Sequence, residues 1–269
     1  MVLNIALIVL TLLLGLCVGS FLNVVIYRLP KNMSLAKPKS HCPNCNYQLK
    51  WYDNIPVLSY IMLGGKCRQC KQKISPRYII VEILNMLLWF VALMLNTSIF
   101  FPSIETNYVM FGVWCVALST LICVAFCDYE NMEIPDELQI VLLICGVVSL
   151  LYGDASSHVF GFLLGGGFFF IFSALFYLIR RKEGLGFGDI KLMAVLGLLL
   201  GLKATIVTII LSTISGAIVL SVVALINAKK NVDKEVKCYP FAVFIVPAAM
   251  IALFVGDIIA NWYLSLFIV

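Results

Sequence analysis

Residues 3–26 read LNIALIVLTLLLGLCVGSFLNVVI, an apolar run without a single charged side chain. A run longer than the ~20 residues that cross a bilayer predicts a transmembrane helix. The rest of the chain has the same character, because 62% of its 269 residues are hydrophobic, only 12% are charged and its mean hydropathy is +1.03. A soluble domain does not need so many long apolar runs, so we expect an all-α polytopic membrane protein.

About eight such segments can be placed along the sequence. They cover residues 3–26, 78–95, 107–127, 138–153, 158–179, 190–202, 204–227 and 239–265. The sixth has only about 13 residues, so it must lie against a thinned or water-filled region or begin deeper than its neighbours. Its boundary with the seventh falls near Gly201 and Lys203. The chain therefore divides into a first helix (1–27), a polar loop (28–77) and a membrane-embedded core (78–269).

The polar loop between the first two spans carries a large positive charge. Its ten basic residues are opposed by one acid, Asp53, for a net charge of +9. They are Arg28, Lys31, Lys37, Lys39, Lys50, Lys66, Arg68, Lys71, Lys73 and Arg77. Basic loops stay in the cytoplasm, so we expect this loop inside and both chain ends outside. The overall charge of +5 is thus a topology signal with secondary contact to anionic lipid, and it does not indicate a nucleic-acid partner.

The first span is expected to be a retained anchor. It has no basic segment before its apolar run, and that run exceeds the roughly 7 to 15 residues of a cleaved signal peptide.

Four cysteines in the polar loop form two pairs, Cys42-x-x-Cys45 and Cys67-x-x-Cys70. This spacing is close to that of a four-thiolate zinc site, in which the metal is structural because no coordination position stays open. The alternative is two disulfides, which a reducing cytoplasm disfavours. His41 could replace a thiolate, although with four thiols available we interpret it as an exposed neighbour. Zinc would organise a small subdomain in a loop that has few ways to bury a core.

Two aspartates, Asp128 and Asp189, lie where a long apolar segment meets a short polar loop. Carboxylates beside hydrocarbon are costly and indicate a functional site. Two expected helices lie between these aspartates in the sequence and carry the chain across the membrane and back. Asp128 and Asp189 can therefore meet at one membrane face. One can stay ionised to take a proton from water while the other stays protonated to polarise a carbonyl, which suits peptide hydrolysis without a covalent intermediate. Gly184, Gly186 and Gly188 disfavour a regular helix before Asp189 and let backbone approach a bound peptide.

Other polar residues have simpler interpretations. Asp136 follows a proline at the start of a span, where a carboxylate can cap the helix. Glu82 can pair with Arg77 or face the site. A serine or cysteine protease needs a base beside its nucleophile. The two histidines do not fit this role, because His41 lies in the cysteine loop and His158 near the expected outer face. The glycines before Asp189 do not follow a strand, so they do not form a dinucleotide loop.

Together these motifs resemble bacterial type IV prepilin peptidases. The resemblance covers about residues 15–200 and rests on several motifs at once. They are Gly19-Ser20-Phe21-Leu22-Asn23-Val24-Val25-Ile26-Tyr27-Arg28-Leu29-Pro30, the two Cys-x-x-Cys pairs, Ile74-Ser75-Pro76-Arg77-Tyr78 leading to Glu82, the segment 128–136, and Gly-x-Gly-Asp at 186–189.

The resemblance implies a multi-pass enzyme of the bacterial inner membrane. Members of the family cut the basic leader of prepilins and pseudopilins on the cytoplasmic side, then methylate the new N-terminal amine with S-adenosylmethionine. The family's catalytic aspartates correspond to Asp128 and Asp189. Glu130, Glu133 and Asp136 would receive the basic leader, which the +9 loop cannot attract.

The methyl-donor site is poorly visible in the sequence, because no Rossmann fingerprint is present. Its candidates are Gly65 and Lys66 in the cysteine loop, together with the segment 19–28. The Gly15-x-x-x-Gly19 and Gly161-x-x-x-Gly165 spacings also match helix-packing notches. Two other functions stay open: a membrane aspartyl peptidase without methyltransferase activity, and a proton-coupled transporter or zinc adaptor.

Overall fold

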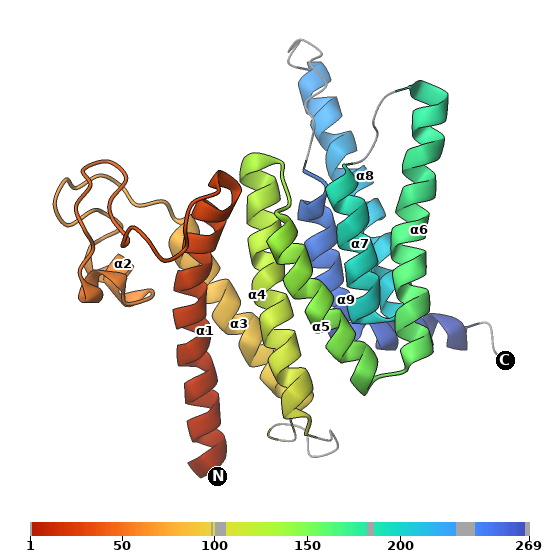
Figure 1. Cartoon of the computed structure of the whole chain (residues 1–269), viewed down its shortest axis with the longest axis horizontal. Coiled ribbons are helices and arrows are strands. Elements are labelled where there is room, and N and C mark those ends of the chain that lie inside the picture. Colours follow the sequence, from red (N-terminus) through yellow and green to blue (C-terminus); the bar gives the residue numbers. More distant parts are fainter. Residues whose placement is uncertain (1, 98, 100–105, 182–185, 230–239, 267–269) are drawn as a thin grey trace. The chain divides into compact units, whose positions relative to one another are not determined.

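The structure is a computed structural model that describes residues 2–97, 99, 106–181, 186–229 and 240–266. Its described part is almost entirely helical, with two isolated β-bridges and no strand (Figure 1). The helices are α1 (Val2–Arg28), η1 (Leu29–Lys31), η2 (Trp51–Asn54), α2 (Leu58–Met62), α3 (Arg77–Asn96), α4 (Tyr108–Asn131), α5 (Asp136–Tyr152), α6 (Ala155–Arg180), α7 (Phe187–Leu200), α8 (Leu202–Lys229) and α9 (Ala242–Ser265).

Each of the eight expected spans coincides with a helix, so the prediction of an all-α polytopic membrane protein is confirmed. Six of these helices, α1, α3, α4, α6, α8 and α9, are long and apolar enough to cross a membrane. The other two, α5 with 17 residues and α7 with 14, are shorter. The boundary between the sixth and seventh expected spans, now α7 and α8, is a turn at Gly201. Its φ of +79° is readily adopted by glycine.

The chain forms two compact units, residues 1–123 and 124–269. In the first, α1 packs along α3 (Figure 1). A buried amide stabilises this packing: Asn85 Nδ2 donates to the Gly15 carbonyl at 2.8 Å, and Asn85 Oδ1 accepts from Ser119 Oγ at 2.7 Å. Ser119 in turn accepts from Trp89 Nε1 at 2.9 Å. Because buried polar groups must be satisfied, this chain of bonds fixes the register of α1 and α3 and of the first part of α4.

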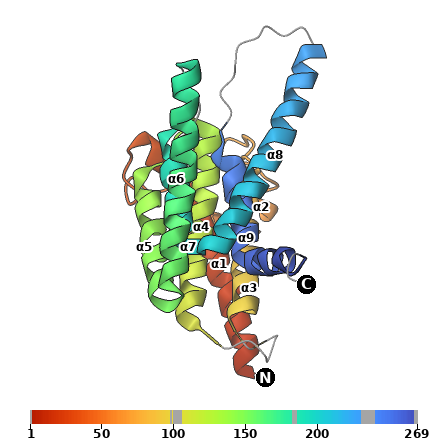
Figure 2. The same ribbon diagram turned by 90° about the vertical axis from the view of Figure 1, so that its right-hand side faces the viewer.

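In the second unit, α7 packs against α5, α6, α8 and α9 (Figures 1 and 2). Apart from Asp189 and Lys191 near its start, α7 has no charged side chain, and most of its residues are buried. Helices of that kind belong inside a bundle. Four longer helices of the same unit contact this helix of 14 residues, and its depth in the bilayer stays a prediction.

Glycines let α6 and α7 approach closely. A Cβ added at Gly161 would lie within 3.0 Å of the Gly197 carbonyl and of backbone at Gly201, and one added at Gly165 would meet the Met193 carbonyl. The Gly161-x-x-x-Gly165 spacing is thus a packing notch of the small-residue type common between membrane helices.

This contact predicts that Gly161→Ala destabilises the protein, whereas Gly167→Ala does not. A methyl group at Gly161 must push backbone apart, at a cost of ~1–3 kcal/mol. Gly167, in the same helix, has nothing within 4 Å of its Cβ position. Thermal unfolding in detergent should therefore show a lower Tm for Gly161→Ala alone, and the same Tm for both variants would contradict the notch.

Candidate active site and metal site

Asp128 lies in the last turn of α4, and only 6% of its surface is exposed. Its Oδ2 accepts a hydrogen bond of 2.9 Å from the backbone N–H of Ala242, the first residue of α9. The first amides of a helix have no partner within it and carry the positive end of its dipole. The Asp128 carboxyl therefore lies at the N-terminus of α9, a segment 114 positions away in sequence, where the backbone would stabilise a negative charge.

Asp189 lies in the first turn of α7 and is 8% exposed. Its Oδ1 is buried without a hydrogen-bond partner among the described residues. The Asp189 carboxyl is close enough to Asp128 for their charges to interact. The structure thus brings together the two aspartates that the sequence indicates, in unlike surroundings: one receives an amide hydrogen bond and the other has an unpaired buried oxygen.

The glycines before Asp189 differ from expectation in one respect. Helix α7 already begins at Phe187, so Gly188 lies within the helix and Gly186 is its N-cap; Gly184 lies outside the described residues. Both described glycines still permit close approach. A Cβ at Gly186 would lie 3.3 Å from Asp189 Oδ2, and one at Gly188 would lie 3.6 Å from Ile134. A bulkier residue at position 186 would crowd the Asp189 carboxyl group, whereas a Cβ at position 188 would make an ordinary van der Waals contact with Ile134.

Asp136 does not cap α5 through its side chain. The N-cap of α5 is Pro135, no side chain caps the helix, and Asp136 is its first residue. Its exposed carboxylate accepts from Lys191 Nζ at 2.9 Å, an ion pair between α5 and α7. The sequence analysis missed this pair, although Lys191 stands out as a charge in an apolar segment, two residues after Asp189.

The four loop cysteines converge. All four sulfur atoms lie within 4.8 Å of one another, with Cys42 Sγ 3.8 Å from Cys70 Sγ and Cys45 Sγ 3.9 Å from Cys67 Sγ. These separations exclude disulfides, whose sulfurs are ~2.05 Å apart. Four sulfurs around a tetrahedral zinc at Zn–S distances of ~2.3 Å lie ~3.8 Å apart. The cluster is therefore compatible with structural zinc, and the exposed His41 is outside it.

The two cysteine pairs have matching turns. Asn46 N–H donates to the Cys42 carbonyl and Lys71 N–H to the Cys67 carbonyl, and both donors have a positive φ, 56° and 58°. Each pair thus presents its thiols on the inside of a tight turn. We call the segment 41–74 that contains both turns the knuckle subdomain.

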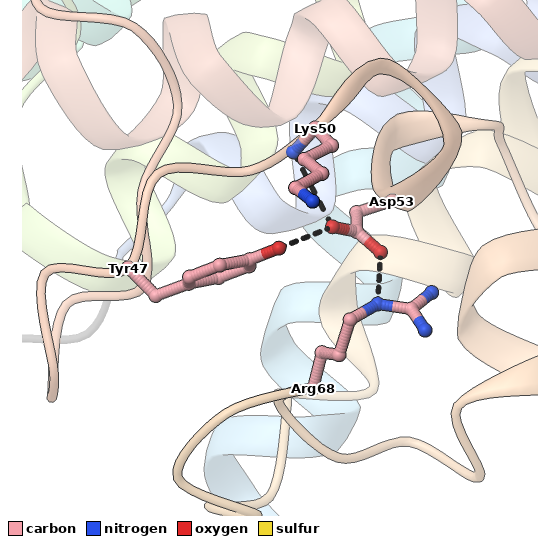
Figure 3. A network of polar contacts seen from close by, with 4 residues as sticks. All are labelled: Tyr47, Lys50, Asp53 and Arg68. Atoms are coloured by element: carbon pink, nitrogen blue, oxygen red, sulfur yellow. Dashed lines mark hydrogen bonds and ion pairs between the residues drawn. The ribbon is translucent and has the colours of Figure 1, made fainter.

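One buried carboxylate joins the two turns (Figure 3). Asp53, in η2, accepts from Arg68 Nε at 2.7 Å, from Tyr47 Oη at 3.2 Å and from the Lys50 amide at 3.3 Å. Burial opposes the ionisation of Asp53, but the Arg68, Lys50 and Tyr47 hydrogen bonds outweigh it and hold the pKa of this carboxyl below its usual value. The sequence analysis registered Asp53 only as the lone acid in the loop, because nothing in its spacing identifies these partners.

Gly65 and Lys66 lie immediately before the second turn of the knuckle subdomain. Gly64 and Gly65 both have positive φ, 59° and 66°, and nothing lies within 4 Å of the Cβ position of Gly64. Lys66 is exposed and forms a β-bridge with Lys73.

The segment 19–28 has structural contacts. A Cβ at Gly19 would lie 2.7 Å from Glu82 Cα, so this glycine allows α1 and α3 to touch. Arg28 donates to three loop carbonyls, those of Ser34, Leu35 and Pro38. Glu82 accepts from the Val57 amide at 2.8 Å.

Comparisons with known proteins agree with these features. Residues 13–96 match the Bacterial Peptidase A24 N-terminal domain, and residues 115–221 match the Type IV leader peptidase family. Relatives named prepilin leader peptidase/N-methyltransferase include those of Aeromonas salmonicida (34% identical, 95% of this chain and 93% of the relative), Pseudomonas aeruginosa (34%, 95% and 92%) and Legionella pneumophila (32%, 94% and 93%). No solved structure matches. The chain belongs to the type IV leader peptidase family.

Proposed function

We propose that this protein cleaves the leader peptide of type IV prepilins or pseudopilins and N-methylates the new N-terminal residue. Relatives that align over more than nine tenths of both chains carry both activities in their names. The observation that carries the peptidase half is the pair of buried carboxylates, Asp128 and Asp189, in unlike surroundings.

In the proposed mechanism the two aspartates have different tasks. Asp128, whose charge is stabilised by the amide of Ala242, takes a proton from a water molecule. Asp189 keeps its proton, because two like charges at short range cannot both persist, and donates a hydrogen bond to the scissile carbonyl oxygen. The water oxygen then attacks the carbonyl carbon. When the tetrahedral intermediate collapses, the C–N bond breaks and the leaving amine takes up the proton held by Asp128.

The substrate would reach the site from the cytoplasm. The +9 polar loop supports a cytoplasmic position for the end of α1, and the names of the relatives support a place in the bacterial inner membrane. Glu130 and Glu133, both exposed beyond Asp128, and Asp136 offer negative charge to a basic leader.

Two cofactors belong to the proposal. Structural zinc would be held by Cys42, Cys45, Cys67 and Cys70 and would make the loop 28–77 a folded subdomain between the first helix (1–27) and the membrane core (78–269). S-adenosylmethionine would supply the methyl group. Gly65 and Lys66 are candidates for its site, since Lys66 offers an exposed ammonium to a ligand with a carboxylate; the open position in this glycine turn is Gly64, because the Tyr60 hydroxyl lies 3.0 Å from the Cβ position of Gly65.

Replacing either aspartate should abolish cleavage while leaving the protein folded. We expect Asp128→Asn and Asp189→Asn each to reduce leader cleavage by at least ~100-fold, because each removes one partner of a proton-transfer pair. The double variant should be little worse than either single one, since the pair acts as a unit. Co-expression with a prepilin and immunoblotting of its processed form measures this.

Asp136→Asn is the matched control, because it neutralises an exposed carboxylate of the same unit that pairs with Lys191. It should retain measurable cleavage. If Asp128→Asn cleaves at the wild-type rate while Asp136→Asn is inactive, Asp136 and not Asp128 is the partner of Asp189.

Metal analysis tests the cysteine cluster. Purified protein should contain about one zinc per chain, and Cys42→Ser combined with Cys67→Ser should remove it, because a hydroxyl is a poor substitute for a thiolate. Cys115→Ser, a buried cysteine outside the cluster, should keep its zinc. Equal metal content in all three proteins would exclude the site.

Methyl transfer can be separated from cleavage. With a cleaved pilin that has a free N-terminal amine and radiolabelled S-adenosylmethionine, Lys66→Ala should transfer less label than wild type, because the donor's carboxylate loses its ammonium partner. Lys73→Ala, its exposed bridge partner, is the control. Equal transfer by both variants would place the donor elsewhere, and no transfer by any protein, wild type included, would leave a peptidase without methyltransferase activity.

A further inference from the structure

The knuckle subdomain has apolar side chains on its outside. Trp51 is 81% exposed, Leu58 58%, Ile61 63% and Met62 84%. They lie on two short consecutive helices, η2 and α2, and we call these four residues the apolar edge. A small metal-organised subdomain gains nothing from exposing its largest apolar side chains to water, so such a cluster indicates a contact.

A hydrogen bond places the apolar edge alongside the first turns of α3 instead of beyond the end of that helix. The Val57 amide, immediately before α2, donates to Glu82 Oε2 at 2.8 Å. Glu82 is five residues into α3, about 7.5 Å along its axis.

A contact with α1 gives the depth of Glu82 relative to the end of that helix. The Cβ position of Gly19 lies 2.7 Å from Glu82 Cα, and Gly19 is nine residues, about 13.5 Å, before the last residue of α1. Figure 1 agrees, because α2 is level with the first turns of α3 and lower than the C-terminal end of α1. The loop therefore folds back to the depth of the two spans instead of projecting away from them.

The backbone conformation of Val57 indicates that a specific contact holds the loop at the depth of α3. Val57 has φ 61° and ψ −51°, a strained conformation that a β-branched residue rarely adopts. Glu82, 7% exposed, accepts the amide that this conformation presents. A buried carboxylate thus fixes α2 against α3 at the point where the chain turns.

The surroundings of the apolar edge identify its partner. Phe21 of α1 and Ile80 of α3, each 51% exposed and at the same level as Glu82, belong to helices long and apolar enough to cross the bilayer. The edge therefore lies at the depth of two helices whose exposed side chains are suited to lipid. Exposed Lys50 and Lys66 flank it in sequence, while the one acid of the loop, Asp53, is buried and paired with Arg68. Lipid acyl chains complement the apolar side chains of the edge, and anionic lipid headgroups complement the flanking lysines.

We propose that the apolar edge is inserted into the adjacent leaflet of the bilayer, where it anchors the knuckle subdomain on anionic phospholipid. The subdomain is then held at the membrane surface by three attachments: α1, α3 and the inserted residues Trp51, Leu58, Ile61 and Met62. This proposal concerns the position of the subdomain and does not depend on the reaction that the enzyme catalyses.

Tryptophan fluorescence of the full-length, zinc-loaded protein in nanodiscs tests the insertion. The discs contain phosphatidylethanolamine and phosphatidylglycerol with or without bromine on the acyl chains, and subtracting the Trp51→Phe emission isolates Trp51. Since interfacial apolar side chains lie among the upper acyl segments, brominated lipid should lower the Trp51 emission roughly twofold. Soluble iodide should quench it weakly.

Two aspartate substitutions on the subdomain make the test specific. Ile61→Asp should withdraw the edge from the acyl chains, so that Trp51 loses its quenching by brominated lipid and becomes sensitive to iodide. Gln69→Asp, equally exposed but outside the edge, should behave like the wild type, and both should keep one zinc.

Strong iodide quenching of Trp51 in the wild type, without quenching by brominated lipid, would overturn the proposal. So would protection from iodide that appears only at high protein density or only after a pilin helix is added, because a second copy or the substrate would then cover the edge.

Discussion

The hydrogen bond from the Ala242 amide to Asp128 is the contact on which the proposed chemistry depends. It links the end of α4 to the beginning of α9 and places a negative charge at a helix N-terminus, where the backbone stabilises it. Without this amide, two buried aspartates at one place would be a liability, because neither forms a salt bridge among the described residues. With it, the charge can rest on Asp128 and the proton on Asp189, so one site offers both a base and an acid.

The bundle around α7 keeps this arrangement in place. Asp189 is in the first turn of a helix enclosed by four others, and glycines at 161, 165 and 197 bring α6 against its backbone. A helix packed on every side cannot easily rotate, so the direction of the Asp189 side chain is set by the packing of its whole helix. The Lys191–Asp136 ion pair adds a link from the same end of α7 to α5, at the exposed edge of the site where its contribution is modest.

Hydrophobic runs were sufficient to predict the membrane helices, because the bilayer sets their length and composition. Cysteine spacing predicted the thiolate cluster for a similar reason, since tetrahedral metal binding restricts local geometry. Contacts that depend on tertiary folding could not be predicted in the same way. The partners of Asp128, Asp136 and Glu82 are Ala242, Lys191 and Val57, none of them adjacent in sequence. Two of these three partners act through a backbone amide, which every residue but proline possesses, so no residue type marks them.

Infrared spectroscopy can determine whether Asp189 is protonated and Asp128 ionised in the resting enzyme, as the proposed mechanism requires. At neutral pH, the spectrum of the wild-type protein minus that of Asp189→Asn should contain the carbonyl stretch of a protonated carboxylic acid. The difference between wild type and Asp128→Asn should contain the bands of a carboxylate. If the Asp189 difference spectrum shows only carboxylate bands, both groups are charged and the division of roles between the two aspartates is wrong.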